Sequence, residues 1–349
     1  MGAYFLVFFF SLIISFMATP IIKKLALFIN AVDIPNDRRI NRVPIPTLGG
    51  IAIYLGFMGA MFFSSSISNL TLGIFVGGSF ILLIGILDDL YELSARLKLA
   101  GQILAAIILI LFNIRVEFIT NPFSGGMIYL GYWGIPLTIL WIIGITNTVN
   151  LVDGLDGLAA GISTIAAFTL FFVALQEGQV TAAILSLILA GSALGFLPYN
   201  FNPAKIFMGD TGAMFCGYIL AAISVAGALK SAATVTLVVP ILALGVPIFD
   251  TIFAIIRRIY NRKPIGEADN GHIHHRLLAL GYNQRQAVLG VYAISILLGS
   301  IALLINGSNI YHALLLLLLV LIFMLYGAWK IGIFTVEVPA EGTSLENKA

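Results

Sequence analysis

The stretch PLTILWIIGITNTVNLVDGLDGLAAG (136–161) carries an apolar run directly into a polar cluster. Two Asn and two Asp follow the run at intervals of three residues. A charged side chain within lipid costs about 2.5–3.5 kcal/mol even on a lenient scale, so such residues are rarely without a role. The stretch therefore predicts a membrane helix whose end is a candidate site.

The composition of the 349-residue chain predicts the same class for the whole protein. Hydrophobic residues make up 60% and charged residues 10%, and the mean hydropathy is +1.05, whereas soluble domains carry about 25% charged residues. We therefore expect an all-α polytopic integral membrane protein. Because one crossing needs about 20 apolar residues, eleven spans are expected, at 3–22, 46–64, 70–87, 98–114, 131–147, 157–175, 179–198, 212–229, 233–256, 286–306 and 310–331.

The basic residues predict the orientation. No Lys or Arg precedes the first span and Lys23 and Lys24 follow it, so the N-terminus is expected outside. With that choice, every Lys and Arg except Arg115 and Lys230 falls on the cytoplasmic side, as the positive-inside rule requires. Membrane topology thus accounts for the distribution of the basic residues, and the net charge of +2 does not indicate a nucleic-acid partner.

The acidic residues crowd at the same face, where no topology rule requires them. Only Glu117 and Glu177 are expected outside. This crowding predicts a polar, metal-capable site on the cytoplasmic surface. We expect one transmembrane domain (1–336) and a disordered cytoplasmic tail (337–349). The single Cys216 excludes an intramolecular disulfide and a Cys-based zinc site, and is expected to be a small buried hydrophobe.

The motif GILDDLYELSARLKLAGQ (85–102) places two acids where the third span meets water. If Asp88 and Asp89 end that helix, both lie at the negative end of its dipole, which is unfavourable. Residues that break a local stability rule cluster at functional sites. Lys98 follows as a candidate for binding phosphate oxygens. The alternative is a solvated interfacial loop.

The opening stretch predicts a break in its helix. On a straight helix Asn147 and Asn150 stay within about 60° of each other, but Asn147 and Asp156 fall on opposite sides. The four polar residues can converge only if the helix breaks, and a Gly follows each Asp. Asp156 can then cap the next helix, which leaves Asn147, Asn150 and Asp153 as site candidates.

A third motif, LPYNFNPAKIFMGDTGAMF (197–215), places Asp210 between glycines just before the eighth span. Asp210 can cap that helix. It can also hold a hard cation together with phosphate, since Mg²⁺ often uses one or two carboxylates plus substrate phosphates, and helix N-termini favour anions. Lys205 adds a cation for phosphate.

Three of the four His lie in the basic loop 257–287, which holds His272, His274, His275 and Arg276. Zinc binding is an alternative, but the loop has no Cys and the spacing is too tight for a closed tetrahedral site. Clustered His instead favour recognition of phosphate or of a polar head group.

Two further regions contribute candidates. The Pro-rich loop 33–50 supplies Arg42 and Thr47. Asp250 lies inside the ninth span and is a functional candidate because it is an intramembrane acid. Together the inner loops favour phosphoryl transfer between a soluble anionic donor and a lipid, with a divalent ion neutralising charge.

Four ordered motifs resemble those of the polyprenyl-phosphate N-acetylhexosamine-1-phosphate transferases, the family of MraY, WecA and TagO. They are GILDDLYELSARLKLAGQ, NTVNLVDGLDGLAAG, NFNPAKIFMGDTGA and HIHHRLL. The HIHHR form and the eleven spans resemble the WecA and TagO branch. The resemblance implies a bacterial inner-membrane enzyme that transfers N-acetylglucosamine 1-phosphate from UDP-GlcNAc to undecaprenyl phosphate and releases UMP, with Mg²⁺ or Mn²⁺. It suggests a homodimer.

The resemblance also implies roles for individual residues. Asp88, Asp89 and Asp210 match catalytic positions, and Asn150 and Asp210 match metal ligands. The donor nucleotide-sugar contacts that it implies are Arg42, Thr47, Asn150, Asp153, Asp156, His272, His274, His275 and Arg276. Asn41, where many relatives have His, and the region of Glu92 depart from the family pattern, so no role is carried over to them.

Two mechanisms remain open. The lipid phosphate can attack the sugar-linked phosphorus directly, with Asp88 orienting or deprotonating it, although a phosphate monoester with a second pKa of about 6 needs little base. Alternatively, an Asp forms a covalent phospho-enzyme. Other classes are a phospho-N-acetylmuramoyl-pentapeptide transferase, a secondary transporter, a membrane scaffold and a CDP-alcohol phosphotransferase. A transporter would place polar residues near the bilayer centre and show a repeat.

Overall fold

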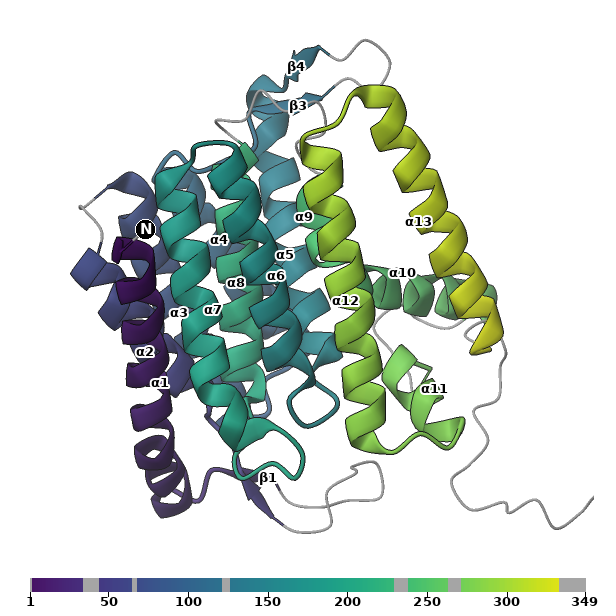
Figure 1. The fold of residues 1–349 in the computed structure, drawn as a ribbon. Coiled ribbons are helices and arrows are strands. Elements are labelled where there is room, and N and C mark those ends of the chain that lie inside the picture. The colour runs from purple at the N-terminus through teal and green to yellow at the C-terminus, as the bar shows by residue number, and fades with distance from the viewer. Residues whose placement is uncertain are drawn as a thin grey trace, which may run out of the picture.

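The computed structural model describes residues 2–33, 44–64, 68–120, 126–228, 238–262 and 271–332. This part of the chain is a bundle of helices with two short antiparallel hairpins (Figure 1). The strands are β1 Val32–Asp33 with β2 Ile45–Pro46, and β3 Phe118–Thr120 with β4 Met127–Tyr129. The α-helices are α1 Gly2–Phe28, α2 Gly50–Ser64, α3 Asn69–Tyr91, α4 Ala95–Leu111, α5 Gly134–Val152, α6 Leu158–Gln176, α7 Val180–Asn200, α8 Gly209–Ala228, α9 Val238–Ala243, α10 Gly245–Tyr260, α11 Ile273–Ala279, α12 Gln284–Asn306 and α13 Ile310–Lys330, and a 3₁₀ turn, η1 Gly131–Trp133, precedes α5.

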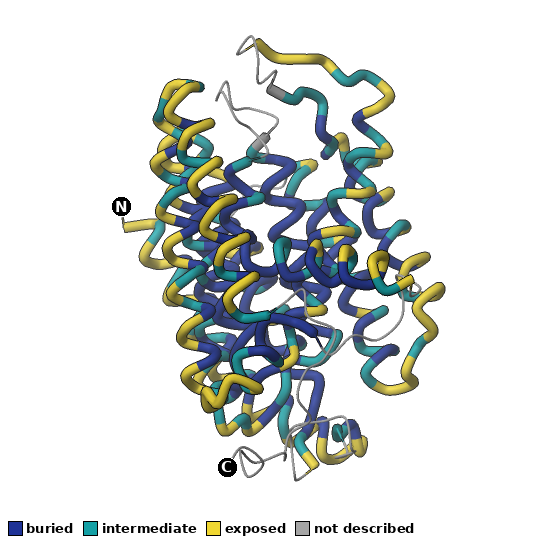
Figure 2. Tube along the Cα trace, turned by 90° about the vertical axis from the view of Figure 1, so that its right-hand side faces the viewer, coloured by how far each residue is buried: buried dark blue, intermediate teal, exposed yellow. Residues whose placement is uncertain are grey.

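The burial pattern is that of a protein solvated by lipid. In the described part of the chain, eight helices are long and apolar enough to cross a membrane, and α2 is a shorter apolar helix. The buried share of the most apolar window is 83% in α8 and 17% in α13, so α8 lies inside the bundle and α13 at its edge (Figure 1). Figure 2 shows buried positions gathered inside the bundle and exposed positions along its outer helices. Large apolar side chains such as Phe5, Phe63 and Leu318 remain exposed. Patches of this kind on many helices fit a lipid-facing surface. The prediction of an all-α multi-pass membrane protein is confirmed.

The ninth expected span, 233–256, is wrong as one straight helix. Its described part divides into α9 and α10 at Leu244, and Figure 1 shows α10 lying across the direction of the upright helices. Gly245 begins α10 and Pro247 lies in its first turn, where the missing N–H of proline costs no helical hydrogen bond. A hydropathy window averages over such a break and cannot detect it.

Glycines bring α2, α3 and α8 into close contact at one end of the bundle. A Cβ on Gly50 would lie 2.1 Å from the amide nitrogen of Gly212, and one on Gly85 would lie 2.5 Å from the Cα of Thr211. Small residues allow membrane helices to approach at backbone distance. Gly85 precedes Asp88 by three residues, so this contact sets the ends of α3 and α8 beside each other.

Candidate active site

Asp89 caps α8 from the end of α3. One carboxylate oxygen accepts a hydrogen bond from the Asp210 N–H (2.9 Å), and the other accepts from the N–H and hydroxyl of Thr211 (3.2 and 2.6 Å). The first N–H groups of a helix lack intrahelical acceptors, and its N-terminus favours negative charge. The unfavourable position of Asp89 on α3 is therefore offset by the favourable end of α8. The alternative that Asp210 caps its own helix is wrong, because Asp89 supplies the cap.

Thr47 lies at the same junction. It is 8% exposed. A Cβ on Gly209 would lie 2.6 Å from the Thr47 hydroxyl and 2.3 Å from an oxygen of Asp89. Gly209 also has a φ of +71°, a backbone conformation that favours glycine. The loop before α8 can therefore hold Asp210 here only with glycine at position 209.

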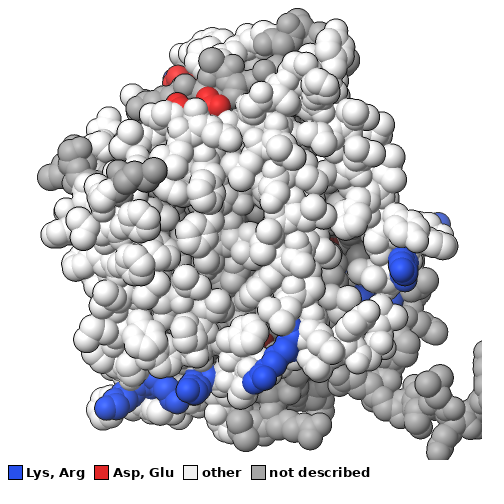
Figure 3. All heavy atoms as spheres, in the orientation of Figure 1, with Lys and Arg blue, Asp and Glu red and all other residues white. Residues whose placement is uncertain are grey.

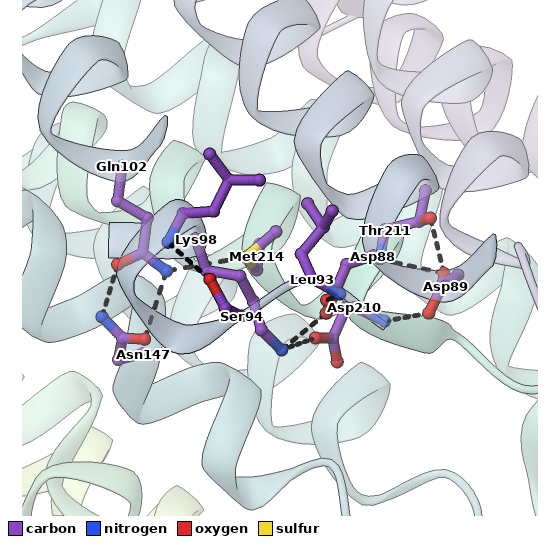
Figure 4. Close-up of polar contacts among 11 residues, drawn as sticks. Asp88, Asp89, Leu93, Ser94, Lys98, Gln102, Asn147, Asp210, Thr211 and Met214 are labelled. Atoms are coloured by element: carbon purple, nitrogen blue, oxygen red, sulfur yellow. Dashed lines mark hydrogen bonds and ion pairs between the residues drawn. The ribbon is translucent and has the colours of Figure 1, made fainter. Parts of the chain in front are cut away.

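Lys98 bridges Asp88 and Asp210 (Figure 4). Its ammonium nitrogen lies 2.6 Å from Asp88 Oδ2 and 2.8 Å from Asp210 Oδ2. The other oxygen of Asp88 accepts a hydrogen bond from the Leu93 N–H at 2.8 Å. Glu92, with a φ of 50°, turns the chain after α3 so that α4 returns with Lys98 facing the acids. The site thus combines two carboxylates with one ammonium group.

Asn150 completes this cluster from α5. Its side chain lies within interaction range of the Asp210 carboxyl, and the carboxyl groups of Asp88 and Asp210 both contact the Lys98 ammonium group. Carboxylate and amide oxygens are the ligands that hard divalent cations prefer. Among the described residues no three His, Cys, Asp or Glu side chains gather as a metal site, but Mg²⁺ commonly needs only one or two carboxylates beside phosphates. The donor set of Asp210, Asn150 and Asp88 fits such an ion.

Asn147 lies one helical turn below Asn150 and is held in an amide pair. It donates to Gln102 Oε1 at 2.6 Å and accepts from Gln102 Nε2 at 3.1 Å, and it also donates to the Ile143 carbonyl at 2.9 Å. Gln102 is 2% exposed and also contacts the sulfur of Met214 at 3.6 Å. The pair joins α4 to α5, so in this structure Asn147 holds together the two helices that carry Lys98 and Asn150.

The predicted helix break in the opening stretch is confirmed. α5 ends at Val152 and α6 begins at Leu158. The expectation that Asp156 caps α6 is wrong: Gly157, with a φ of 81°, is the N-cap and makes no side-chain cap bond. One oxygen of Asp156 instead accepts from Asn202 Nδ2 and from the Ala204 N–H, both at 3.0 Å. Asp156 therefore ties this loop to the loop between α7 and α8.

Asp153 lies in the segment between α5 and α6, where the charges of the acid cluster act on its carboxyl. It keeps part of its surface exposed, but burial of its carboxyl, together with the charges of Asp210, Asp89 and Asp156, raises its pKa to about 8. Like charges disfavour ionisation of one another. The cluster therefore carries more negative charge than its neighbours neutralise, which favours a cation.

The His segment packs against the same loop. A Cβ on Gly154 would lie 2.3 Å from His274 Nε2, so only glycine allows the imidazole so close to the backbone beside Asp153. His274 is 4% exposed. Burial and the neighbouring His275 lower its pKa to about 3, so the ring is neutral at neutral pH. The ring centroids of His274 and His275 are 4.3 Å apart. Arg276 is also buried.

The remaining predicted residues fall elsewhere. Asp250 and His272 form a buried pair with Nδ1 to Oδ2 at 2.8 Å. Lys205 is exposed, and within the described ranges its side chain makes no ion pair. Arg42 lies outside the described residues, as do Asn41 and the tail. Sequence reasoning missed Gln102, although it lies one turn beyond Lys98 within a motif already singled out.

These observations define the class of protein: a multi-pass membrane protein with an acidic, lysine-bridged site at one end of its helical bundle. Residues 71–228 match the family described as glycosyl transferase family 4. The chain belongs to this family, and the resemblance drawn from its four motifs is confirmed.

Its relatives make the relationship more specific. A Bacillus subtilis protein called probable undecaprenyl-phosphate N-acetylglucosaminyl 1-phosphate transferase is 44% identical over 315 residues, which is 90% of this chain and 88% of the relative. A decaprenyl-phosphate N-acetylglucosaminephosphotransferase of Mycobacterium leprae is 40% identical, over 80% of this chain and 78% of its own. A phospho-N-acetylmuramoyl-pentapeptide-transferase of Listeria monocytogenes is 35% identical, but over only 52% of this chain and 60% of its own.

Proposed function

We propose that the protein transfers N-acetylglucosamine 1-phosphate from UDP-GlcNAc to undecaprenyl phosphate and releases UMP. The observation that carries the proposal is the Asp88–Lys98–Asp210 cluster, at 2.6 and 2.8 Å, in a chain 44% identical to the Bacillus subtilis relative of that name. The alternative donor, a UDP-muramoyl-pentapeptide, has weaker support, because the Listeria relative matches only 52% of this chain.

The residues of the cluster account for a direct transfer. An oxygen of the lipid phosphate forms a bond to the sugar-linked phosphorus of the donor, and the bond from that phosphorus to the oxygen bridging to UMP breaks. The lipid phosphate is largely dianionic at neutral pH, since its second pKa is about 6, so Asp88 orients it more than it deprotonates it. Lys98, which bridges two carboxylates in this structure, can turn to a phosphate oxygen and offset its charge.

A divalent cation fits beside these residues. Asp210 and Asn150 would hold Mg²⁺ or Mn²⁺, which stabilises charge on phosphoryl oxygens when bound. Asp89 keeps Asp210 in place through its bonds to the start of α8. We assign the donor nucleotide-sugar to Thr47, Asp153 and the segment His274–Arg276, since His274 packs on the Asp153 loop.

The proposal includes an orientation. Eight of the eleven proposed crossings correspond to the eight long helices, and we assign the other three to α2, α4 and the segment that contains α9 and α10. On the face that Figure 3 shows, Lys and Arg gather at the end opposite to the β3–β4 hairpin. The positive-inside rule then supports a site on the cytoplasmic side and an N-terminus outside. The enzyme would lie in the bacterial inner membrane, and family analogy suggests a homodimer.

An isotope-exchange experiment tests the function. Purified protein in detergent is given UDP-GlcNAc and labelled UMP, with or without undecaprenyl phosphate. Label should enter UDP-GlcNAc only when the lipid is present, and Asp88→Asn and Asp210→Asn should abolish the exchange. Exchange without lipid would favour the covalent mechanism. Absence of exchange under all conditions, with Asp210→Asn behaving like the wild type, would remove the enzyme interpretation. Exchange by Asp210→Asn at the wild-type rate would instead refute the role assigned to Asp210.

A further inference from the structure

Asp250 is a buried acid that the transfer chemistry does not use. It lies on α10 and is 3% exposed. A buried carboxylate is costly unless it is paired and hydrogen-bonded. Its partners should therefore explain why α10 keeps an acid at this position.

Both oxygens of Asp250 bind the start of α11. Oδ2 lies 2.8 Å from Nδ1 of His272, and Oδ1 accepts the N–H of Ile273 at 2.8 Å. His272 is the N-cap residue of α11, and its own side chain makes no cap hydrogen bond. Asp250 thus caps α11 from α10, because its carboxylate accepts a backbone N–H that has no acceptor within the helix. The same carboxylate also fixes the position of the His272 ring.

The contact with the carboxylate determines where the His272 ring carries its proton. A carboxylate accepts hydrogen bonds, so Nδ1 must be the N–H nitrogen whether the ring is neutral or charged. Nε2 is then the nitrogen that can gain or lose a proton or exchange a partner. In the neutral ring Nε2 is an acceptor, suited to a hydroxyl or amide N–H and not to a bare phosphate oxygen.

The His272 ring is connected to the candidate active site through His274. It stacks on His274 with centroids 5.8 Å apart and planes 6° from parallel. His274 in turn packs on Gly154, next to Asp153. Only the His274 imidazole therefore separates His272 from the loop that carries Asp153, and the charge of Asp210 acts on that Asp153 carboxyl.

From this geometry we infer that Asp250 is a positioning residue: it keeps the His272 proton on Nδ1 and leaves Nε2 to accept a hydrogen bond from the donor sugar's hydroxyl or amide group. The substrate part of this inference rests on the proposed function. The tautomer part does not, so the two can fail separately.

The test is Asp250→Asn in the full-length protein. The amide oxygen can still accept the Ile273 N–H, but the NH₂ group then faces His272 and forces its Nδ1 to become the acceptor. In protein labelled with ¹⁵N-histidine, the Nδ1 signal of His272 should move from the protonated to the unprotonated range. kcat/KM for UDP-GlcNAc should fall about 10- to 100-fold, by analogy with metal-ligating histidines that lose the partner orienting the ring. The melting temperature should stay close to that of the wild type.

Two further variants separate positioning from general damage. Thr251→Val alters the next residue of α10, whose buried hydroxyl has no hydrogen-bond partner among the described residues, and should behave as the wild type. In a His272→Asn background, Asp250→Asn should cause no further loss of activity.

An unchanged Nδ1 signal or full activity in Asp250→Asn would overturn the inference, as would an equal loss in Thr251→Val or additive losses in the double variant. If the wild-type protein releases no UMP from UDP-GlcNAc, the proposed function fails, and the ¹⁵N signal still decides whether Asp250 fixes the tautomer.

Discussion

Asp89→Asn and Asp88→Asn should have different effects, although the two acids are neighbours and look equivalent in the sequence. Asp89 accepts three hydrogen bonds from the start of α8, two from backbone N–H groups and one from a hydroxyl. Asn offers one acceptor oxygen, so its NH₂ group would face the Thr211 N–H and leave that donor unpaired. A buried unpaired donor costs about 1–3 kcal/mol, and loss of the charge at the helix end costs about 0.3–1 kcal/mol more.

Asp89→Asn should therefore lower the free energy of unfolding by about 1.3–4 kcal/mol and reduce activity by displacing Asp210. Asp88→Asn keeps an acceptor for the Leu93 N–H. It loses the ion pair with Lys98, but removal of the repulsion between Asp88 and Asp210 offsets that loss. It should abolish transfer with a much smaller change in stability. Denaturant unfolding of protein in detergent, followed by tryptophan fluorescence, measures the first quantity, and UMP release measures the second. Equal stability losses in both variants would refute the separation of the two roles.

Three further predictions concern the surroundings of the site. Gln102→Leu or Asn147→Leu alone should lower the free energy of unfolding by about 1–3 kcal/mol, because each leaves a buried amide unpaired. The double variant should lose less than the sum of the two single losses. Strict additivity would contradict the amide pair. Gly154→Ala should raise KM for the donor, because the added Cβ would lie 2.3 Å from His274 Nε2 and would displace the imidazole. Gly144→Ala, whose added Cβ would meet nothing within 4 Å, should leave KM unchanged. Equal effects on KM would count against the contact. The pKa of Asp153 is raised from 3.8 to about 8, so the folded state holds this proton more tightly than the unfolded state. The melting temperature in EDTA should therefore fall as the pH rises between these two pKa values, and Asp153→Asn should flatten the decline. An unchanged slope in that variant would show that another group is responsible.

The sequence predicts features that depend on local geometry. The helix break between Asn150 and Asp156 follows from 100° of rotation per residue, and the structure has it between α5 and α6. The apolar runs are also a local property of the sequence, so their number predicts a multi-pass membrane protein. The sequence also predicts that the loop 85–102 and Asp210 share one face, because the positive-inside rule assigns both to the same side of the membrane.

Partners far apart in the chain could not be predicted. Asp89 and Thr211 are 122 residues apart, and Asp156 and Ala204 are 48 apart. Each acid binds backbone N–H groups, which every residue except proline carries, so no side-chain pattern identifies the partner. Asp250 meets His272 only because α10 turns across the bundle after Leu244, a break that the apolar composition of the segment conceals.

The most direct test of the account is the product formed by purified protein from UDP-GlcNAc labelled in its sugar-linked phosphate. With undecaprenyl phosphate and Mg²⁺, the account predicts one labelled lipid, of the mass of undecaprenyl-diphosphate-GlcNAc, and one UMP released for each lipid formed. Lys98→Gln and Asp210→Asn should form neither. A labelled lipid of another mass, UMP release without lipid product, or normal product from the Lys98 variant would contradict the account.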